Sequence, residues 1–206
     1  MNIQHFDQLI EIGLQTAKEN EELLCNFDSQ NGDGDLGITF SKVMKSLQQT
    51  YQTFDGQDVG KFLYHAGMDI SENAASTMGT LLASGFMQAG KSLKGKEKLE
   101  KEDFVVFYVS LIEGIQKRGK AAIGDKTILD TLKPIADSLK ETSDLDLKDA
   151  FEKAVEVAEK AVEKTKQLEA KHGRAARYEN KSLGLVDSGS VVAKLLTQIF
   201  YQFYKS

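Results

Sequence analysis

Apolar residues recur every three or four positions along almost the whole chain, and this spacing constrains the fold more than any other feature. In the segment 147–162 they are spaced by four, four, three and four, and charged residues fill the other face. This pattern is typical of an amphipathic helix with one buried face. The 206 residues contain a single proline, Pro134, whereas a sheet-rich chain uses proline more often at its turns. We therefore expect an all-α fold.

The chain divides into about eight such segments without a linker, a low-complexity tract or an internal repeat. One of them, residues 74–90, is rich in Gly, Ala and Ser, which allow helices to approach closely. We expect one domain over residues 1–206. The charged stretch near 145–171 is interpreted as an outer helix of this domain, with a partner-binding coiled coil as the alternative. The segments are 6–24, 43–54, 62–68, 74–90, 104–115, 129–139, 147–162 and 191–203.

Composition and charge exclude several classes of function. The net charge of −5 and the absence of a basic block with aromatics argue against a nucleic-acid partner. No uninterrupted apolar run of about 18 residues exists, so no membrane span is expected. The N-terminus is polar and does not resemble a signal peptide. The single cysteine, Cys25, excludes an internal disulfide, and we expect a cytoplasmic protein.

Three carboxylates stand close together in the segment 28–37. Asp28, Asp33 and Asp35 are interspersed with glycines, and two like charges about 4 Å apart repel by about 4 kcal/mol at an effective dielectric near 20. A hard divalent cation with oxygen ligands relieves this repulsion. A plain Asp/Gly turn is the alternative. Because a helix begins at about Gly37, its free N–H groups lie beside the acids and favour phosphate.

Two known sequence motifs overlap this segment, but the chain does not meet the requirements of either. Gly32, Gly34 and Gly37 match the dinucleotide-binding pattern, but that pattern needs a preceding strand, and here a helix precedes it. An EF-hand loop that starts at Asn31 would place Leu36 where glycine is required and Lys42 where glutamate is required. A metal that bridges to phosphate remains the better interpretation.

The other polar joints also contain residues that could bind a ligand, and each of these residues also has a simpler structural interpretation. Arg174 suits a phosphate clamp because guanidinium offers paired donors, but a surface ion pair is the simpler interpretation. The segment 187–189 is interpreted as the cap of the last helix, and Gly124–Thr127 as a helix start capped by Asp125 or Thr127. Cys25 is expected to be a small buried residue. We expect His5, His65 and His172 at the surface or at caps.

Taken together, the joints resemble those of the dihydroxyacetone kinase L subunit (DhaL) family. The similarity rests on Asp28-x4-Asp33-x-Asp35-x-Gly37, Gly119, the run from Gly124 to Pro134, Gly173-Arg174-Ala175 and Asp187-Ser188-Gly189. The resemblance covers nearly the whole chain. It implies a barrel of about eight antiparallel amphipathic helices with a nucleotide at one end.

The resemblance also implies the ligands, the partners and the activity. Two Mg²⁺ ions would be held by Asp28, Asp33 and Asp35, bridging the phosphates of bound ADP or ATP, with Arg174 beside the transferred group. A phosphoryl group would arrive from a DhaM-type donor subunit of the phosphotransferase system. It would leave to dihydroxyacetone, or a related short ketose, on a DhaK-type subunit. The implied nucleotide contacts are Leu36, Gly37, Ile38, Thr39, Thr77, Met78, Gly79, Gly119, Ile128, Arg174, Asp187, Ser188 and Gly189.

The chain departs from the family pattern at several phosphate contacts. Leu36 stands where the family usually has histidine, Thr39 where it often has asparagine, and Met78 where a phosphate-contacting serine is usual. Ser188 replaces a proline. A non-catalytic nucleotide-binding regulator is therefore kept as an alternative, and a Ca²⁺-binding structural protein as a weaker one.

Overall fold

The computed structural model describes residues 1–177 and 182–206, which form eight α-helices. The all-α prediction is confirmed. No helix in this part of the chain is long and apolar enough to cross a membrane. The α-helices are α1 (Phe6–Ser29), α2 (Leu36–Thr53), α3 (Val59–Asn73), α4 (Thr77–Ser92), α5 (Lys101–Gly119), α6 (Leu129–Glu141), α7 (Leu147–Lys164) and α8 (Ser188–Lys205), and the short 3₁₀ turns are η1 (Ile3–His5), η2 (Thr165–Gln167) and η3 (Ala175–Arg177).

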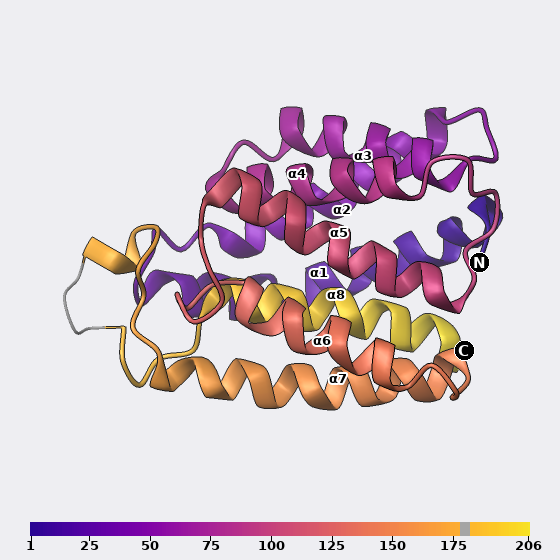
Figure 1. Cartoon of the computed structure of the whole chain (residues 1–206). Coiled ribbons are helices and arrows are strands. Elements are labelled where there is room, and N and C mark those ends of the chain that lie inside the picture. The colour runs from indigo at the N-terminus through magenta and orange to yellow at the C-terminus, as the bar shows by residue number, and fades with distance from the viewer. Residues whose placement is uncertain (178–181) are drawn as a thin grey trace.

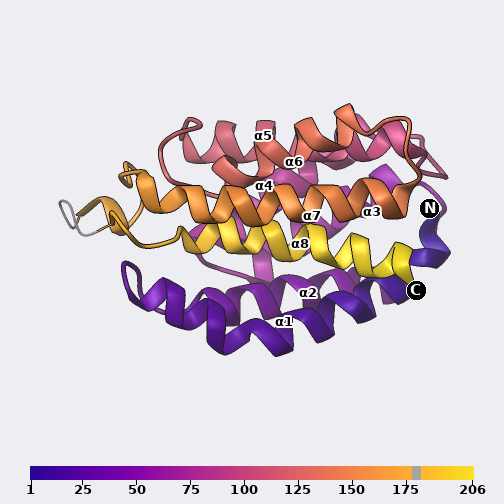
Figure 2. The ribbon, with the colours of Figure 1, turned by 90° about the horizontal axis from the view of Figure 1, so that it is seen from below.

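The helices close into a barrel. Each helix packs against the next along the chain, and α8 packs against α1. Figure 2 shows α8 lying between α7 and α1. Each apolar stripe faces the inside, where Phe40, Phe62, Phe104 and Phe151 are almost completely buried. Burial of a large apolar side chain contributes about 1.5–3 kcal/mol, so these stripes hold the barrel together.

The up-and-down order of the helices decides which joints meet. Both chain termini lie at one end of the barrel, and α1 runs from there to the opposite end (Figure 1). Because neighbouring helices are antiparallel, every joint from an odd-numbered to an even-numbered helix lies at that opposite end. These joints contain residues 30–35, 74–76, 120–128 and 165–187. The unusual residues of the sequence therefore gather at one end, although they are far apart along the chain.

Small residues allow α3, α4 and α5 to pack closely, as the composition of residues 74–90 predicts. A Cβ atom on Gly90 of α4 would lie 2.5 Å from the Tyr64 backbone nitrogen of α3. A Cβ atom on Gly114 of α5 would lie 2.4 Å from the Ser84 carbonyl oxygen of α4. Backbones that approach this closely leave no room for a side chain.

The charged segment near 145–171 is an outer helix of the same barrel, as expected. Its α-helical part ends at Lys164, earlier than the pattern indicated. Phe151, Ala154 and Ala158 are buried, and α7 packs against α6 and α8. Since neighbouring helices already cover its apolar face, the coiled-coil alternative is wrong.

Candidate functional site

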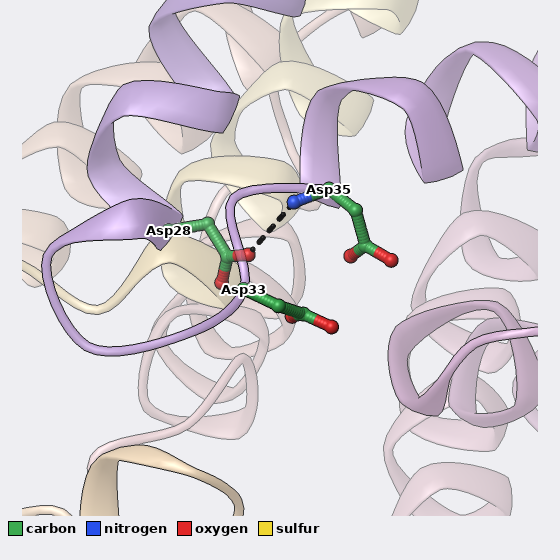
Figure 3. Close-up of side chains that lie close together, drawn as sticks. All are labelled: Asp28, Asp33 and Asp35. Carbon is green, nitrogen blue, oxygen red and sulfur yellow. Dashed lines mark hydrogen bonds between the residues drawn. The ribbon is translucent and has the colours of Figure 1, made fainter.

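The acidic loop is ordered by hydrogen bonds from its own backbone. Asp28 lies in the last turn of α1, and its Oδ2 accepts hydrogen bonds from the backbone N–H groups of Gly34 at 2.8 Å and Asp35 at 3.2 Å. Figure 3 shows the carboxylates of Asp33 and Asp35 pointing to the same side. Asp35 is the N-cap residue of α2, although its side chain forms no cap hydrogen bond. The loop thus presents free carboxylate oxygens next to a helix N-terminus.

The three carboxylates form a donor set that fits a hard divalent cation. One oxygen from each of Asp28, Asp33 and Asp35 lies within 4.8 Å of the others. Partial burial, together with the charges of Asp33 and Asp28, raises the pKa of Asp35. A bound cation would reverse this repulsion and favour the ionised form. Oxygen-only ligands are suited to Mg²⁺ or Ca²⁺ rather than to a soft metal.

Arg174 reaches the same cluster from the joint between α7 and α8. Its Nη2 lies 2.8 Å from Oδ2 of Asp33. The two side chains are 61% and 39% exposed, so this ion pair is accessible from solvent and contributes little to stability. A cationic group beside the carboxylates can also reach an anionic ligand held on a metal there.

Helix N-termini surround the cluster because every even-numbered helix begins at this end. Ser76 caps α4 by accepting from Gly79 N–H at 3.0 Å, and Asp187 caps α8 by accepting from Ser190 N–H at 2.6 Å. The interpretation of 187–189 as a cap is confirmed. Ser188 Oγ donates to Asp28 Oδ1 at 3.3 Å. N–H groups at helix N-termini favour bound phosphate.

A cavity of about 510 Å³ opens between these joints. Apolar side chains line one part of it, including Phe27, Leu81, Ile115 and Val186, which the sequence analysis did not single out. For Phe27, Leu81 and Ile115 the sequence signal is an apolar stripe along a helix, which does not distinguish a cavity wall from the core. Val186 lies in the joint before α8, where no such stripe exists. The predicted residues that line the cavity are Asp28, Asp33, Asp35, Leu36, Thr77, Met78, Gly119, Ile128, Arg174, Asp187, Ser188 and Gly189.

Four predicted contacts do not line this cavity. Ile38 is 48% exposed on the outside of α2, and Thr39 is buried, with its Oγ1 donating to Ser76 Oγ at 3.1 Å. A Cβ atom on Gly79 would lie 1.9 Å from the Ala74 carbonyl oxygen. On Gly37 it would lie 2.0 Å from the Glu21 carbonyl oxygen of α1. Both glycines therefore permit close backbone contact.

We expect Gly37→Ala to destabilise the protein by about 1–3 kcal/mol, because the new methyl group meets a backbone carbonyl that cannot move freely. Gly13→Ala in α1 is the matched control. There the Cβ atom would meet Sδ of the Met44 side chain, not backbone, at 2.8 Å, and alanine favours helix by about 1 kcal/mol. Urea unfolding measures both variants. An equal stability change in the two would contradict the close α1–α2 contact.

The two capping candidates in the joint 119–127 behave differently, since Thr127 Oγ1 accepts from the N–H of Leu129, the first residue of α6, at 3.3 Å. Asp125 does not cap α6. Asp130 instead accepts from the N–H groups of Gly124 at 2.5 Å and Thr127 at 2.7 Å. The carboxylate of Asp125 accepts from Ala122 N–H and pairs with His172 Nε2 at 3.0 Å. The backbone hydrogen bond from Ala122, with the pairing to Lys171, lowers the pKa of Asp125 to about 2.

The histidines and the cysteine fall in different surroundings. His5 and His65 are exposed, as expected. His172 is half-buried: its side chain is 38% exposed, lines the cavity and pairs with Asp125, so it lies at the surface as expected. Cys25 is also only half-buried. A Cβ atom on Gly37 would lie 2.9 Å from the Sγ of this cysteine, which places the thiol at the α1–α2 contact.

Asp187 should give the protein a pH-dependent stability. Desolvation raises the pKa of this carboxyl to about 6, against an ordinary value of 3.8. The folded state therefore binds a proton more tightly than the unfolded state, and the contribution of Asp187 to stability falls as pH rises from about 4 to about 6. Asp187→Asn retains a capping oxygen. Without metal or nucleotide, the free energy of unfolding of Asp187→Asn relative to wild type should rise between about pH 4 and about pH 6. A difference that does not change with pH would contradict the raised pKa of Asp187.

Comparison with known proteins identifies the family. A model of the DAK2 domain matches residues 30–202. The ADP-binding subunit DhaL of PEP-dependent dihydroxyacetone kinase 1 from Listeria innocua is 30% identical over 188 residues, covering 91% of this chain and 90% of that protein. The ADP-binding subunit DhaL of the PEP-dependent kinase from Escherichia coli is 27% identical over 180 residues, covering 86% of each.

A solved structure has the same fold. The dihydroxyacetone kinase of C. freundii superposes with a TM-score of 0.73 at 20% identity. The match covers 95% of this chain but 33% of that longer chain. Another structure of the same kinase, in complex with AMP-PNP and Mg²⁺, superposes with a TM-score of 0.71 at 21% identity. At these identities the likeness establishes the fold alone.

The architecture is that of a helical barrel in which carboxylates and helix N-termini surround one cavity at its end. The chain belongs to the DAK2 domain family. Its resemblance to DhaL is thereby confirmed, and the family places it among phosphotransferases.

Proposed function

We propose that this chain is the nucleotide-binding subunit of a dihydroxyacetone kinase. In this proposal it relays a phosphoryl group through bound ADP or ATP to dihydroxyacetone or a related short ketose. The observation that carries the proposal is the convergence of Asp28, Asp33 and Asp35 with Arg174 at one cavity. The relatives named as ADP-binding subunits support the nucleotide, and the C. freundii complex with AMP-PNP supports Mg²⁺.

Each group has a separate role in the proposed site. The carboxylates of Asp28, Asp33 and Asp35 hold two Mg²⁺ ions, which neutralise phosphate charge when bound. Arg174 stabilises charge on the transferred group through its guanidinium donors. The free N–H groups at the start of α2 orient phosphate oxygens. The apolar wall beside Leu81 and Ile115 receives the base, because nucleotide pockets combine apolar walls with a few polar anchors.

The substrate and the donor belong to separate subunits in this proposal. The relatives from L. innocua and E. coli are named as subunits of PEP-dependent kinases. By analogy, a DhaM-type subunit supplies the phosphoryl group and a DhaK-type subunit holds the ketose. The chain itself then needs no nucleophile that bonds to substrate. The charge-stabilising groups described above are sufficient, since phosphoryl transfer depends mainly on positioning and electrostatics.

A transfer assay tests the proposal. The chain is mixed with Mg²⁺, γ-labelled ATP, a DhaK-type subunit and dihydroxyacetone, and labelled ketose phosphate is measured by chromatography. A second reaction uses ADP, a DhaM-type subunit and its phosphorylated donor chain. We expect product in both reactions, only when the chain is present. No product in either, with bound nucleotide confirmed, would overturn the transfer function.

A non-catalytic regulator is the second candidate, and Met78 is the observation that favours it. This side chain lines the cavity, and its Cε lies 2.8 Å from the position of a Cβ atom on Gly189. The resemblance implies a phosphate-contacting serine at this position of the sequence, where this chain has methionine. If the chain is a regulator, we expect it to bind nucleotide but to form no labelled ketose phosphate in the same assay. Met78→Ser would then leave transfer absent, whereas in a kinase subunit it should retain or raise transfer.

A further inference from the structure

A buried lysine connects the α5–α6 joint to both sides of the α7–α8 joint. Lys126 is 4% exposed. Its Nζ donates to the carbonyl oxygens of Leu168 at 3.1 Å and Leu185 at 2.8 Å, and also to that of Ser182. The bonded carbonyls lie on both sides of Arg174 in sequence. A single ammonium thus holds together two stretches of chain, residues 168–177 and 182–187.

These contacts use the full donor capacity of Lys126. An ammonium group has three N–H donors and no acceptor, and each donor here has a carbonyl partner. Lys126 therefore has no donor left for a phosphate in the neighbouring cavity. Burial lowers the pKa of this lysine. Its backbone has a φ of 60°, a left-handed conformation that costs about 1–2 kcal/mol outside glycine, so the surrounding contacts must stabilise it.

Asp125 holds the same joint from the preceding position. Its Oδ1 lies 3.0 Å from Lys171 Nζ, and its Oδ2 lies 3.0 Å from His172 Nε2. Its carbonyl oxygen accepts from Lys171 N–H at 3.1 Å. Lys171 and His172 immediately precede Gly173 and Arg174. Adjacent side chains on the α5–α6 joint therefore fix the backbone that leads to the guanidinium.

We propose that Asp125 and Lys126 form a positioning pair that keeps Arg174 at the carboxylate cluster. Arg174 Nη2 lies 2.8 Å from Asp33 Oδ2. The preceding Gly173 has a φ of 70°, and a Cβ atom added to it would meet no atom within 4 Å. The pair adds to a hydrogen bond from Ala170 N–H to Ser182 Oγ at 3.0 Å, which also joins the two stretches on either side of Arg174. The inference rests on the proposed function, since it assigns the pair a purpose at the nucleotide site.

A double-mutant cycle on nucleotide affinity tests the inference. Lys126→Met, Arg174→Ala and the double variant are compared with wild type by titration calorimetry with AMP-PNP and Mg²⁺, because this analogue carries the γ-phosphoryl group that Arg174 is proposed to contact. We expect Lys126→Met to weaken binding about tenfold in the wild-type background but less than about twofold when Arg174 is already alanine. A lysine that only stabilised the fold would weaken binding equally in both backgrounds, and this additive result would overturn the inference.

A control variant and a replacement variant complete the test. Lys133→Met removes a surface lysine of α6 that pairs with Asp137 at 2.5 Å and should leave the affinity unchanged. If Lys126→Met does not fold, Asp125→Asn replaces it in the same cycle, because the amide keeps an acceptor for Ala122 N–H but loses the charge that holds Lys171 and His172. Additivity with Asp125→Asn would overturn the inference equally.

Hydrogen exchange separates failure of the inference from failure of the proposed function. Amides of residues 168–174 should exchange faster in Lys126→Met than in wild type or Lys133→Met, with no nucleotide present. Unchanged exchange would overturn the anchoring. A wild-type protein that binds no nucleotide would overturn the proposed function. A wild type that binds, with additive effects in the cycle, would overturn the positioning role alone.

Discussion

Asp33→Asn is expected to abolish Mg²⁺-dependent nucleotide binding and phosphoryl transfer together. Asp33 places a carboxylate among the clustered oxygens that lie within 4.8 Å of one another. An amide has nearly the same shape but no negative charge, so it is a weaker ligand for a hard cation. Asp33 is the best position for this test because Asp28 also accepts hydrogen bonds from Gly34 and Asp35, and its replacement would disturb the loop.

The folded state should tolerate Asp33→Asn. The side chain is 39% exposed and its ion partner Arg174 is 61% exposed, and an exposed pair contributes at most about 1 kcal/mol. Calorimetry with Mg²⁺ and ADP measures binding, and thermal unfolding reports the fold. Asp137→Asn, which removes the partner of Lys133 on α6, is the control and should bind normally. Retained transfer in Asp33→Asn would contradict the metal site.

Arg174→Ala is expected to lower the rate of phosphoryl transfer by about 10²–10³, the usual cost of removing one preorganised donor from developing charge. Single-turnover transfer at saturating nucleotide and Mg²⁺ measures this effect apart from affinity. Arg174→Lys should restore only part of the rate, because a lysine ammonium lacks the planar paired donors of guanidinium.

Arg118→Ala provides the comparison for Arg174. Arg118 is an exposed arginine in the last turn of α5, at the same end of the barrel, and does not line the cavity. Its replacement should leave the rate within about twofold of wild type, as expected for a surface substitution. A similar loss in both variants would show that the general positive charge of this end matters, and not the place of Arg174 beside Asp33.

The helical architecture could be predicted from the sequence because it depends on local spacing. Residues 147–162 have the period of an amphipathic helix, and α7 covers them. The acidic cluster was also visible, since Asp28, Asp33 and Asp35 lie within eight residues. Its position beside Arg174 followed from family resemblance; the up-and-down order of the helices explains it physically, as both joints lie at the same end.

Contacts between distant joints could not be predicted in this way. Lys126 bonds to Leu168 and Leu185, and Asp125 to His172, through packing that no local pattern records. The helix-cap interpretation of Asp125 failed because that carboxylate has partners from another joint. Gly37 illustrates the same limit, since its role depends on the approach of Glu21 from α1.

Direct identification of the bound molecules tests whether this end of the barrel holds a nucleotide on metal. Freshly purified protein is denatured, and the released nucleotide and metal are identified by chromatography, mass spectrometry and elemental analysis. We expect ADP or ATP together with Mg²⁺, either released from the purified protein or taken up when both are added back. A folded protein that releases neither, and binds neither nucleotide in the presence of Mg²⁺, would contradict it.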